Sequence, residues 1–412
     1  MQSKEDSTSM KSLCKLFYAD PQAYAAAYEK RFHDPDTVHL DLCIGENPAF
    51  FCQTTDLYRR MLSVERTNNA VNQLCGTLPG IALHQFQSRC LVDEIVLTNH
   101  IEGVQSTRKE ITQILQDLSQ NKKRERFVGL VNKYLCLMRR ETLSLKTPTD
   151  IRKIYDDIFY EEIKENDPKD LPDGVIFRRD SVSVCSASGK EIHRGLYPEK
   201  KIILVMEKAL QFLHTDSCDY LLRIAVFHYL FGYIHPFYDG NGRTSRFISS
   251  YLLSQKLNSS IGYRLSYTIK EHLPQYHEAF KICNHYNNKG DLTPFAEMFL
   301  EIVDISMKQL YEALSERSER LRHYESQIKR FPYAGDKSMY QLYDLLLQAA
   351  LFSDSGITQK ELEFHMGMSY NTVRAKLHKI PQDLLTETHQ GKRAYMLCLK
   401  AVDQILEKEA YN

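Results

Sequence analysis

The chain has 412 residues, and its 53 lysines and arginines equal its 53 aspartates and glutamates in number. This length predicts two or three domains with a large core, and the zero net charge gives no global argument for binding nucleic acid or membrane. The ten cysteines form no CxxC pair and no zinc-like cluster, which favours reduced thiols in a cytosolic protein. Because no leader-like or membrane-length apolar run is found, we expect a cytoplasmic protein with no membrane partner.

The beginning of the chain predicts helices and suggests no chemistry. Residues 1–12 are polar, and we expect them to be disordered. A helix interrupted near Asp20-Pro21 is predicted over Leu13–Phe32, and another from Asp56 to about Thr77. We interpret this region as scaffold.

A further helix is predicted over residues 83–103, where apolar side chains recur at helical spacing and Gly103 can cap the end. Glu102 lies one turn after Thr98, so both side chains can share one face. On its own, Glu102 would be an ordinary exposed glutamate. The pattern Thr107-x-x-Glu110 then fits a capping box that starts the next helix.

A hairpin is predicted over residues 174–197, the only one that we expect before the C-terminal part. Val175–Val184 alternates loosely, 186–189 is a turn signal, and Glu191–Tyr197 can return as the second strand. Taken alone, this would be a surface hairpin that closes a gap.

The stretch from His235 to Arg246 contains the residues that suggest chemistry. An apolar helix is predicted over 220–233, and Pro236 forces the preceding His235 out of the helical region. The glycines and the asparagine that follow Asp239 predict a turn. A second helix follows, so the stretch is expected to form a helix, a glycine-rich loop and a helix.

This geometry predicts an anion cradle. The loop residues Gly240, Asn241 and Gly242 run into a helix start, where backbone N–H groups and the helix dipole attract an anion. Arg243 and Arg246 lie three residues apart and can both reach the same anion. Phosphate is the anion that such a cradle commonly binds.

Two further side chains complete a transfer site. Asp239 is a hard oxygen ligand beside the cradle, which suits Mg²⁺ bridging phosphates. His235, at the other end of the loop, can accept a proton near neutral pH. The combination predicts nucleotidyl or phosphoryl transfer, although each residue taken alone would be an ordinary turn or surface residue.

The run fits His-Pro-Phe-x-Asp-Gly-Asn-Gly-Arg-x-x-Arg at residues 235–246, nine specified positions of twelve. It resembles the signature of the Fic family (filamentation induced by cAMP). The resemblance implies a mainly α fold with a helical core, ATP as substrate with Mg²⁺, and transfer of AMP to a Ser, Thr or Tyr hydroxyl of a target protein. The protein could also transfer AMP to one of its own hydroxyl groups.

The resemblance also gives meaning to two other segments. Thr98–Gly103 resembles the family's inhibitory motif, Ser/Thr-x-x-x-Glu-Gly/Asn, which implies that Glu102 pairs with Arg246 and keeps the ATP γ-phosphate from docking. Glu102 could instead orient water and remove AMP from a modified target. The 174–197 hairpin would be the flap that holds the target by strand addition.

Nucleotide contacts outside the loop are expected in the helices that follow it. Tyr286, Asn287 and Phe295 are candidates to line an adenine pocket by stacking and hydrogen bonding. Aromatic residues at helical spacing are more often part of a core.

Three helices and a hairpin from Tyr340 onward are in the order of a winged helix-turn-helix. Its recognition helix carries Asn371, Arg374, Lys376 and Lys379, and its wing carries Lys392 and Arg393. Acidic residues nevertheless outnumber basic ones in the whole module. A DNA-binding domain usually has a net basic surface, so protein docking and DNA binding are equally favoured.

Two functions of different classes follow. One is an adenylyltransferase inhibited by Glu102, and the other is a DNA-binding regulator whose Fic-like core senses a nucleotide. His235 favours the enzyme, because a sensor has no use for a base. The expected parts are an N-terminal segment (1–38), a helical region with the inhibitory helix (39–165), a catalytic core with the flap (166–323), a linker (324–338) and the winged module (339–412).

Overall fold

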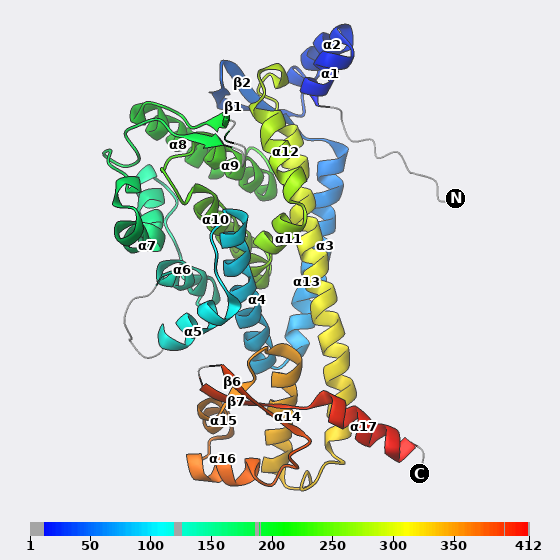
Figure 1. Cartoon of the computed structure of the whole chain (residues 1–412). Helices are drawn as coiled ribbons and strands as arrows, with labels where there is room; N and C mark the ends of the chain where they lie inside the picture. The colour runs from blue at the N-terminus through cyan, green and yellow to red at the C-terminus, as the bar shows by residue number, and fades with distance from the viewer. Residues whose placement is uncertain (1–11, 119–125, 186–188, 190, 391, 411–412) are drawn as a thin grey trace. The chain divides into compact units, whose positions relative to one another are not determined.

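The computed structural model describes residues 12–118, 126–185, 189, 191–390 and 392–410. The chain forms two compact units: one comprises the described residues of 1–68, 97–104 and 125–307, the other those of 69–96, 105–124 and 308–412. The fold is mainly helical, as expected from the sequence (Figure 1). No helix in the described ranges is long and apolar enough to cross a membrane.

The N-terminal elements of the first unit are two helices and a hairpin. The predicted helix is interrupted where expected, giving α1 (Leu13–Ala19) and α2 (Pro21–Phe32), because the Asp20 side chain accepts from the N–H groups of Gln22 and Ala23 and so caps α2. Disorder was predicted for residues 1–12, of which residues 1–11 lie outside the described part of the chain. Strands β1 (Thr37–Ile44) and β2 (Asn47–Cys52) pair in antiparallel fashion.

The β1–β2 hairpin shows that the expectation of a single hairpin before the C-terminal part was wrong. The apolar run of β2 is buried as a block from Ala49 to Cys52 and therefore lacks the alternation by which a strand is recognised. The flap hairpin is present but short, with β3 (Ser183–Cys185) paired to β4 (Glu191–Arg194). Its predicted turn lies mostly outside the described residues.

Helix α9 (Tyr220–Ile234) is the centre of the core. Nearly all its side chains are buried, as expected for a helix that is apolar on every side. It packs against α8 (Glu199–Leu213) and α10 (Asn241–Lys256) (Figure 1). The predicted helix, loop and helix around the signature are thereby confirmed.

The remaining elements of the first unit surround this core. They are α6 (Val128–Met138), α7 (Pro148–Asn166), η1 (Pro168–Asp170), η2 (Ser259–Tyr263), α11 (Leu265–Glu271), α12 (Leu273–Asn284) and η3 (Tyr286–Asn288). Three helices contribute residues to both units, namely α3 (Thr55–Thr77), α4 (Gly80–Ile101) and α13 (Thr293–Ile328). Because α13 is continuous to Ile328, the predicted linker begins inside a helix.

The second unit contains the C-terminal module with its helices and a small sheet. Its elements are α5 (Arg108–Leu118), α14 (Lys337–Phe352), β5 (Ile357–Thr358), α15 (Gln359–Met366), α16 (Tyr370–Leu377), β6 (Leu385–Gln390), β7 (Lys392–Leu397) and α17 (Leu399–Ala410). The strands form one sheet in the order β5-β7-β6. Thr358 and Glu361 form a capping box, which explains where α15 begins. The assignment as a winged helix-turn-helix stays a prediction.

Candidate active site

His235 lies where α9 ends. It adopts the left-handed conformation (φ 51°, ψ 63°), and its N–H donates to the Phe231 carbonyl at 3.0 Å. Burial, together with the nearby His193 and Arg178, lowers the pKa of His235 to about 4. The imidazole is therefore neutral at pH 7, which is the form that accepts a proton.

The signature loop is held rigid by its own side chains. Gly240 has a φ of 77°, and a Cβ there would lie 3.1 Å from the ring of Phe159, so glycine is favoured on both grounds. The Asn241 amide donates to the Phe237 carbonyl at 2.8 Å and accepts from the Phe237 N–H at 3.0 Å. Asn241, predicted to bind phosphate, thus uses its side chain to brace the loop.

Arg246 is bound by the end of α4. Its guanidinium donates to the Thr98 hydroxyl at 2.8 Å and to the Thr98 carbonyl at 2.9 Å. It also forms an ion pair with Glu102 Oε1 at 2.8 Å, with 1% of the Arg246 side chain exposed and 33% of the Glu102 side chain. The structure therefore brings Glu102 and Arg246 together, and Thr98 shares the face of Glu102 as the sequence predicted.

The Glu102 carboxylate lies over the first turn of α10. A Cβ placed on Gly242 would overlap Glu102 Oε1, so the carboxylate occupies the space above that glycine. Burial alone would raise the pKa of Glu102, but the ion pair with Arg246 outweighs it and the pKa is lowered. A charged carboxylate thus rests at the helix N-terminus, where an anion is favoured.

Arg243 binds two other carboxylates. It lies 3.3 Å from Glu162 on α7 and 3.2 Å from Asp239, and it stacks on the Phe159 ring at 4.4 Å. The Arg243 Nε is buried and has no acceptor among the described residues. The two arginines, predicted to share one anion, therefore contact separate acids, and Arg243 keeps a donor that an incoming oxygen could satisfy.

Residues 145–253 match the model of the Fic/DOC family. The chain contains a Fic domain. The matched range includes the whole signature loop and the flap, while Glu102 lies outside it.

Curated relatives of this Fic domain are adenylyltransferases by name. The chain is 30% identical over 132 residues to the protein adenylyltransferase Fic of Drosophila ananassae, a match that covers 32% of the chain and 24% of the relative. It is 28% identical over 152 residues to that of Drosophila mojavensis, covering 36% and 27%. These matches therefore span about a quarter of the relatives' length.

Solved structures with a Fic domain are similar at lower identity. A Fic family protein from Desulfovibrio desulfuricans is 16% identical with a TM-score of 0.46, covering 81% of this chain and 95% of that one. A Fic domain containing signaling protein from Bacteroides thetaiotaomicron is 17% identical with a TM-score of 0.44, covering 62% and 97%.

Asp239 fits a metal that is held mainly by a substrate. Its side chain is 57% exposed beside the cradle. No group of three or more His, Cys, Asp or Glu that could hold a metal occurs in the described part of the chain. Mg²⁺ commonly binds through one or two carboxylates plus substrate phosphates, so one carboxylate here is compatible with it.

Of the three adenine-pocket candidates, Phe295 is in the core. It is fully buried and packs edge-on against Phe280 at 4.6 Å, so it cannot stack on a ligand. Tyr286 is 65% exposed and remains accessible. The backbone N–H of Asn287 donates to the His285 ring at 3.1 Å.

Two residues of the site, Glu162 and Arg178, were not predicted from the sequence. Glu162 was one acidic residue among several on its helix, and no local pattern marked its pairing with Arg243. Arg178 lies in the part of the flap that precedes β3, and its guanidinium donates to the His235 carbonyl of the signature loop. Both partnerships join segments far apart in the chain, which a local pattern does not reveal.

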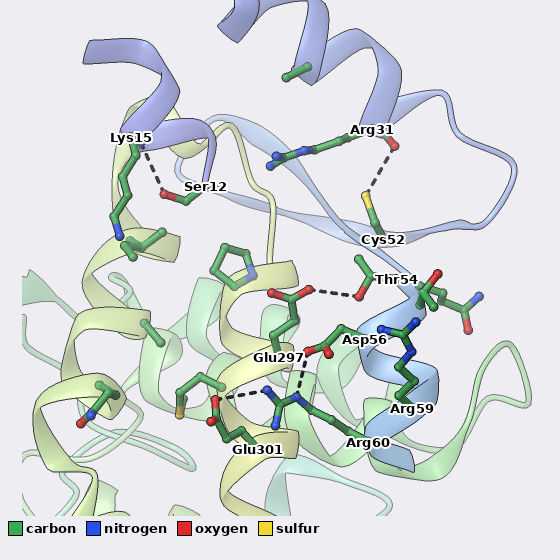
Figure 2. A pocket seen from close by; sticks show the side chains of 18 of the residues that line it. Ser12, Lys15, Arg31, Cys52, Thr54, Asp56, Arg59, Arg60, Glu297 and Glu301 are labelled. Atoms are coloured by element: carbon green, nitrogen blue, oxygen red, sulfur yellow. Dashed lines mark hydrogen bonds and ion pairs between the residues drawn. The ribbon is translucent and has the colours of Figure 1, made fainter. Parts of the chain in front are cut away.

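A cavity of about 1920 Å³ lies elsewhere in the same unit, between the N-terminal helices, α3, α12 and α13 (Figure 2). It contains none of the signature residues. Its charged lining residues are Lys15, Lys30, Arg31, Arg59 and Arg60 with Asp34, Asp36, Asp56, Glu278, Glu297 and Glu301. Positively and negatively charged side chains are almost equal in number, so the lining favours neither anions nor cations as ligands. The signature loop is therefore the better candidate for binding phosphate.

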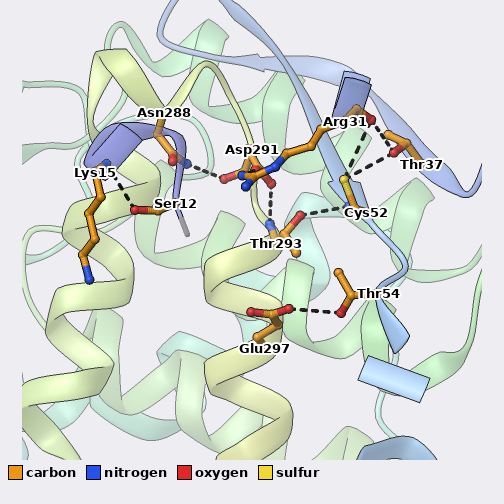
Figure 3. Close-up of polar contacts among 10 residues, drawn as sticks. All are labelled: Ser12, Lys15, Arg31, Thr37, Cys52, Thr54, Asn288, Asp291, Thr293 and Glu297. Carbon is orange, nitrogen blue, oxygen red and sulfur yellow. Dashed lines mark hydrogen bonds and ion pairs between the residues drawn. The ribbon is translucent and has the colours of Figure 1, made fainter. Parts of the chain in front are cut away.

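One lining residue of this cavity, Arg31, takes part in a buried ion pair (Figure 3). Arg31 on α2 lies 3.0 Å from Asp291, which is fully buried just before α13. Asp291 also accepts from the Thr293 N–H at 2.9 Å, and the Thr293 hydroxyl accepts from the Cys52 N–H at 2.9 Å. These bonds join α2, β2 and α13, so we interpret the region as structural.

Proposed function

We propose that the protein is an adenylyltransferase that moves AMP from ATP to a hydroxyl of a protein and is inhibited by Glu102. The hydroxyl oxygen attacks the α-phosphorus, the bond to pyrophosphate breaks, and the hydroxyl proton passes to neutral His235. The proposal is supported by the Fic domain and by relatives named protein adenylyltransferase. Buried His235 is uncharged at pH 7, which is the form that can accept this proton.

The cradle supplies the electrostatic part of the reaction. The N–H groups at the start of α10 and the cation of Arg243 stabilise negative charge on the phosphates. Mg²⁺, bound by the phosphates and Asp239, would neutralise the charge of the leaving pyrophosphate.

The observation that carries the inhibitory part is the ion pair of Glu102 with Arg246 at 2.8 Å. A carboxylate already occupies the N-terminus of α10 and one of the two signature arginines. A γ-phosphate that docks there must displace this carboxylate or bind beside it, and two negative charges at one site repel each other. We infer that ATP binds with its γ-phosphate displaced and its α-phosphorus out of line. Removal of AMP by water that Glu102 orients is an activity that the same contact would permit.

Target recognition would use the flap. In the two-stranded sheet of β3 and β4, each strand has an outer edge to which an extended target segment can add. Backbone pairing would fix the distance from a Ser, Thr or Tyr hydroxyl to His235 with little dependence on sequence. A flexible segment of this same protein could be modified in this way.

We do not extend the proposal to DNA binding. In the C-terminal module, Lys376 lies 3.6 Å from Asp336, and Arg393 lies 2.6 Å from Glu387. Two of the five basic residues on the predicted recognition helix and wing therefore have acidic partners. Arg374 is exposed on α16, and the Lys392 side chain is outside the described part of the chain.

Intact-protein mass spectrometry after incubation with ATP and Mg²⁺ tests the proposal. The Glu102→Gly protein should gain AMP adducts, and Glu102→Gly with His235→Ala should gain almost none, because a positioned base contributes roughly 10²–10⁴-fold. Both proteins should show the same ATP-induced rise in Tm, since the imidazole is not part of the cradle. Equal adduct yields from the two proteins would exclude His235 as the base.

A further inference from the structure

Arg178 is a buried cation outside the signature. It lies between η1 and β3 in the arm of the flap, and none of its side-chain surface is exposed. The structure shows no ion pair for it among the described residues, and burial lowers its pKa. A buried charge is costly unless its hydrogen bonds are satisfied, so the contacts of Arg178 require an explanation.

The guanidinium of Arg178 donates to three backbone carbonyls. Nε donates to His235 at 2.9 Å, Nη2 to Leu196 at 2.8 Å, and Nη1 to Asp180 at 2.5 Å. Asp180 precedes β3 and Leu196 follows β4, so one side chain joins both ends of the flap to the signature loop. The planar fork of arginine allows this, whereas the point charge of lysine does not.

The segments on either side of the flap strands donate hydrogen bonds to three consecutive backbone carbonyls, those of Ile234, His235 and Pro236. The Leu196 N–H donates to Ile234 at 3.1 Å, Arg178 Nε donates to His235 at 2.9 Å, and the Arg178 N–H donates to Pro236 at 3.2 Å. His235 has a positive φ, a conformation that costs energy in a residue other than glycine and persists only where its surroundings enforce it. Arg178 supplies two of these three bonds.

Gly195 shows how closely these groups pack. A Cβ at this position would lie 2.5 Å from Arg178 Nη2 and 3.0 Å from the His235 Cβ. Glycine at this position therefore lets the flap backbone approach both the guanidinium and His235 closely.

We propose that Arg178 is a positioning residue that fixes the His235 imidazole relative to the target segment on the flap. This inference rests on the proposed function. Because a misplacement of about 1 Å can reduce a rate about a hundredfold, Arg178 matters for transfer without touching ATP.

The charge of Arg178 provides a second readout. The charged and titratable groups that act on the His235 imidazole are Arg178, His193 on β4 and Glu102 at the end of α4. Arg178 and His193 lower the His235 pKa, and Glu102 raises it. Replacing Arg178 by methionine should raise this pKa, whereas lysine, which keeps the charge, should leave it nearly unchanged.

The experiment compares Arg178→Met, Arg178→Lys and the control Arg179→Met, each in the Glu102→Gly protein. Arg179 is the neighbouring arginine and is exposed. Its replacement by methionine removes the same charge but none of the hydrogen bonds that Arg178 makes to the backbone carbonyls. We expect AMP transfer about 100-fold slower in both Arg178 variants, an unchanged ATP-induced rise in Tm, and parental rates in the control. NMR titration of His235 should show a raised pKa in Arg178→Met alone.

A parental rate and a parental His235 pKa in a folded Arg178→Met protein would overturn the inference. If methionine prevents folding, Arg178→Lys and Gly195→Ala decide. The first removes the fork and the second displaces it, so both should slow transfer to a similar degree. If the Glu102→Gly parent transfers no AMP, the proposed function fails instead, and the His235 titration still tests the contact with Arg178.

Discussion

Replacing Glu102 by glycine should release AMP transfer and weaken the folded protein at the same time. In the structure Glu102 gives Arg246 one charge-assisted bond of 2.8 Å, while Thr98 gives the same guanidinium two more. Arg246 would thus keep two acceptors after the substitution. The expected loss is the value of one hydrogen bond to a charged group, about 1.5–3 kcal/mol, rather than the larger cost of an orphaned buried charge.

Two measurements follow from this magnitude. Thermal unfolding without nucleotide should show a Tm that is lower by roughly 3–12 °C in Glu102→Gly. Added ATP should then raise the Tm more than in the parent protein, because the γ-phosphate can pair with Arg246 in place of Glu102 and is no longer repelled by that carboxylate. Transfer should rise by about two orders of magnitude if the α-phosphorus had been misplaced by about 1 Å.

Glu46→Gly is a matched control, because Glu46 is exposed in the turn between β1 and β2. It should leave the Tm, the ATP response and the rate unchanged. Adding Arg246→Ala to Glu102→Gly should abolish the gain in transfer. If Glu102→Gly has the parental rate and the parental ATP response, the carboxylate is not an inhibitor and the ion pair is merely structural.

Two further predictions concern pH and stability. Because burial, His193 and Arg178 lower the pKa of His235 from 6.5 to about 4, the imidazole stays neutral down to that value. Glu102 raises this pKa, so its removal should lower the pKa further. The rate of the Glu102→Gly protein should therefore be level from about pH 5 to 7 and fall only below about pH 4, and a midpoint near 6.5 in the pH profile would contradict the assigned environment. Arg31→Met should lower the free energy of unfolding by about 3–5 kcal/mol, measured in urea, because it leaves buried Asp291 without its cation. The exposed neighbour variant Lys30→Met should change it by less than about 0.5 kcal/mol.

The parts of the site that depend on local sequence patterns could be predicted from the sequence. The helix before His235, the glycine turn and the second helix follow from proline, glycine and apolar spacing, and the structure has all three. The shared face of Thr98 and Glu102 followed from helical spacing alone. The pairing of Glu102 with Arg246 required the resemblance to the Fic family, because no local rule relates residues so far apart in the chain.

The parts that could not be predicted depend on tertiary contacts. The block of buried residues in β2 has no period that separates a strand from a helix. The pairing of Arg243 with Glu162 and the bonds from Arg178 to backbone carbonyls join distant segments, and carbonyl acceptors carry no sequence signal. The bracing role of Asn241 was missed because its amide suits a phosphate as well as a backbone partner.

If Glu102 inhibits transfer as proposed, its overlap with the space above Gly242 restricts which mutations could activate the protein. Any side chain at position 242 would expel the Glu102 carboxylate, but it would also fill the place where phosphate must approach the helix. Under the proposed function, a substitution of Gly242 should therefore remove inhibition only together with activity. Gain-of-function variants should arise at the end of α4, at Glu102 or Thr98, and a genetic screen for excess AMP transfer should recover them there rather than in the signature loop.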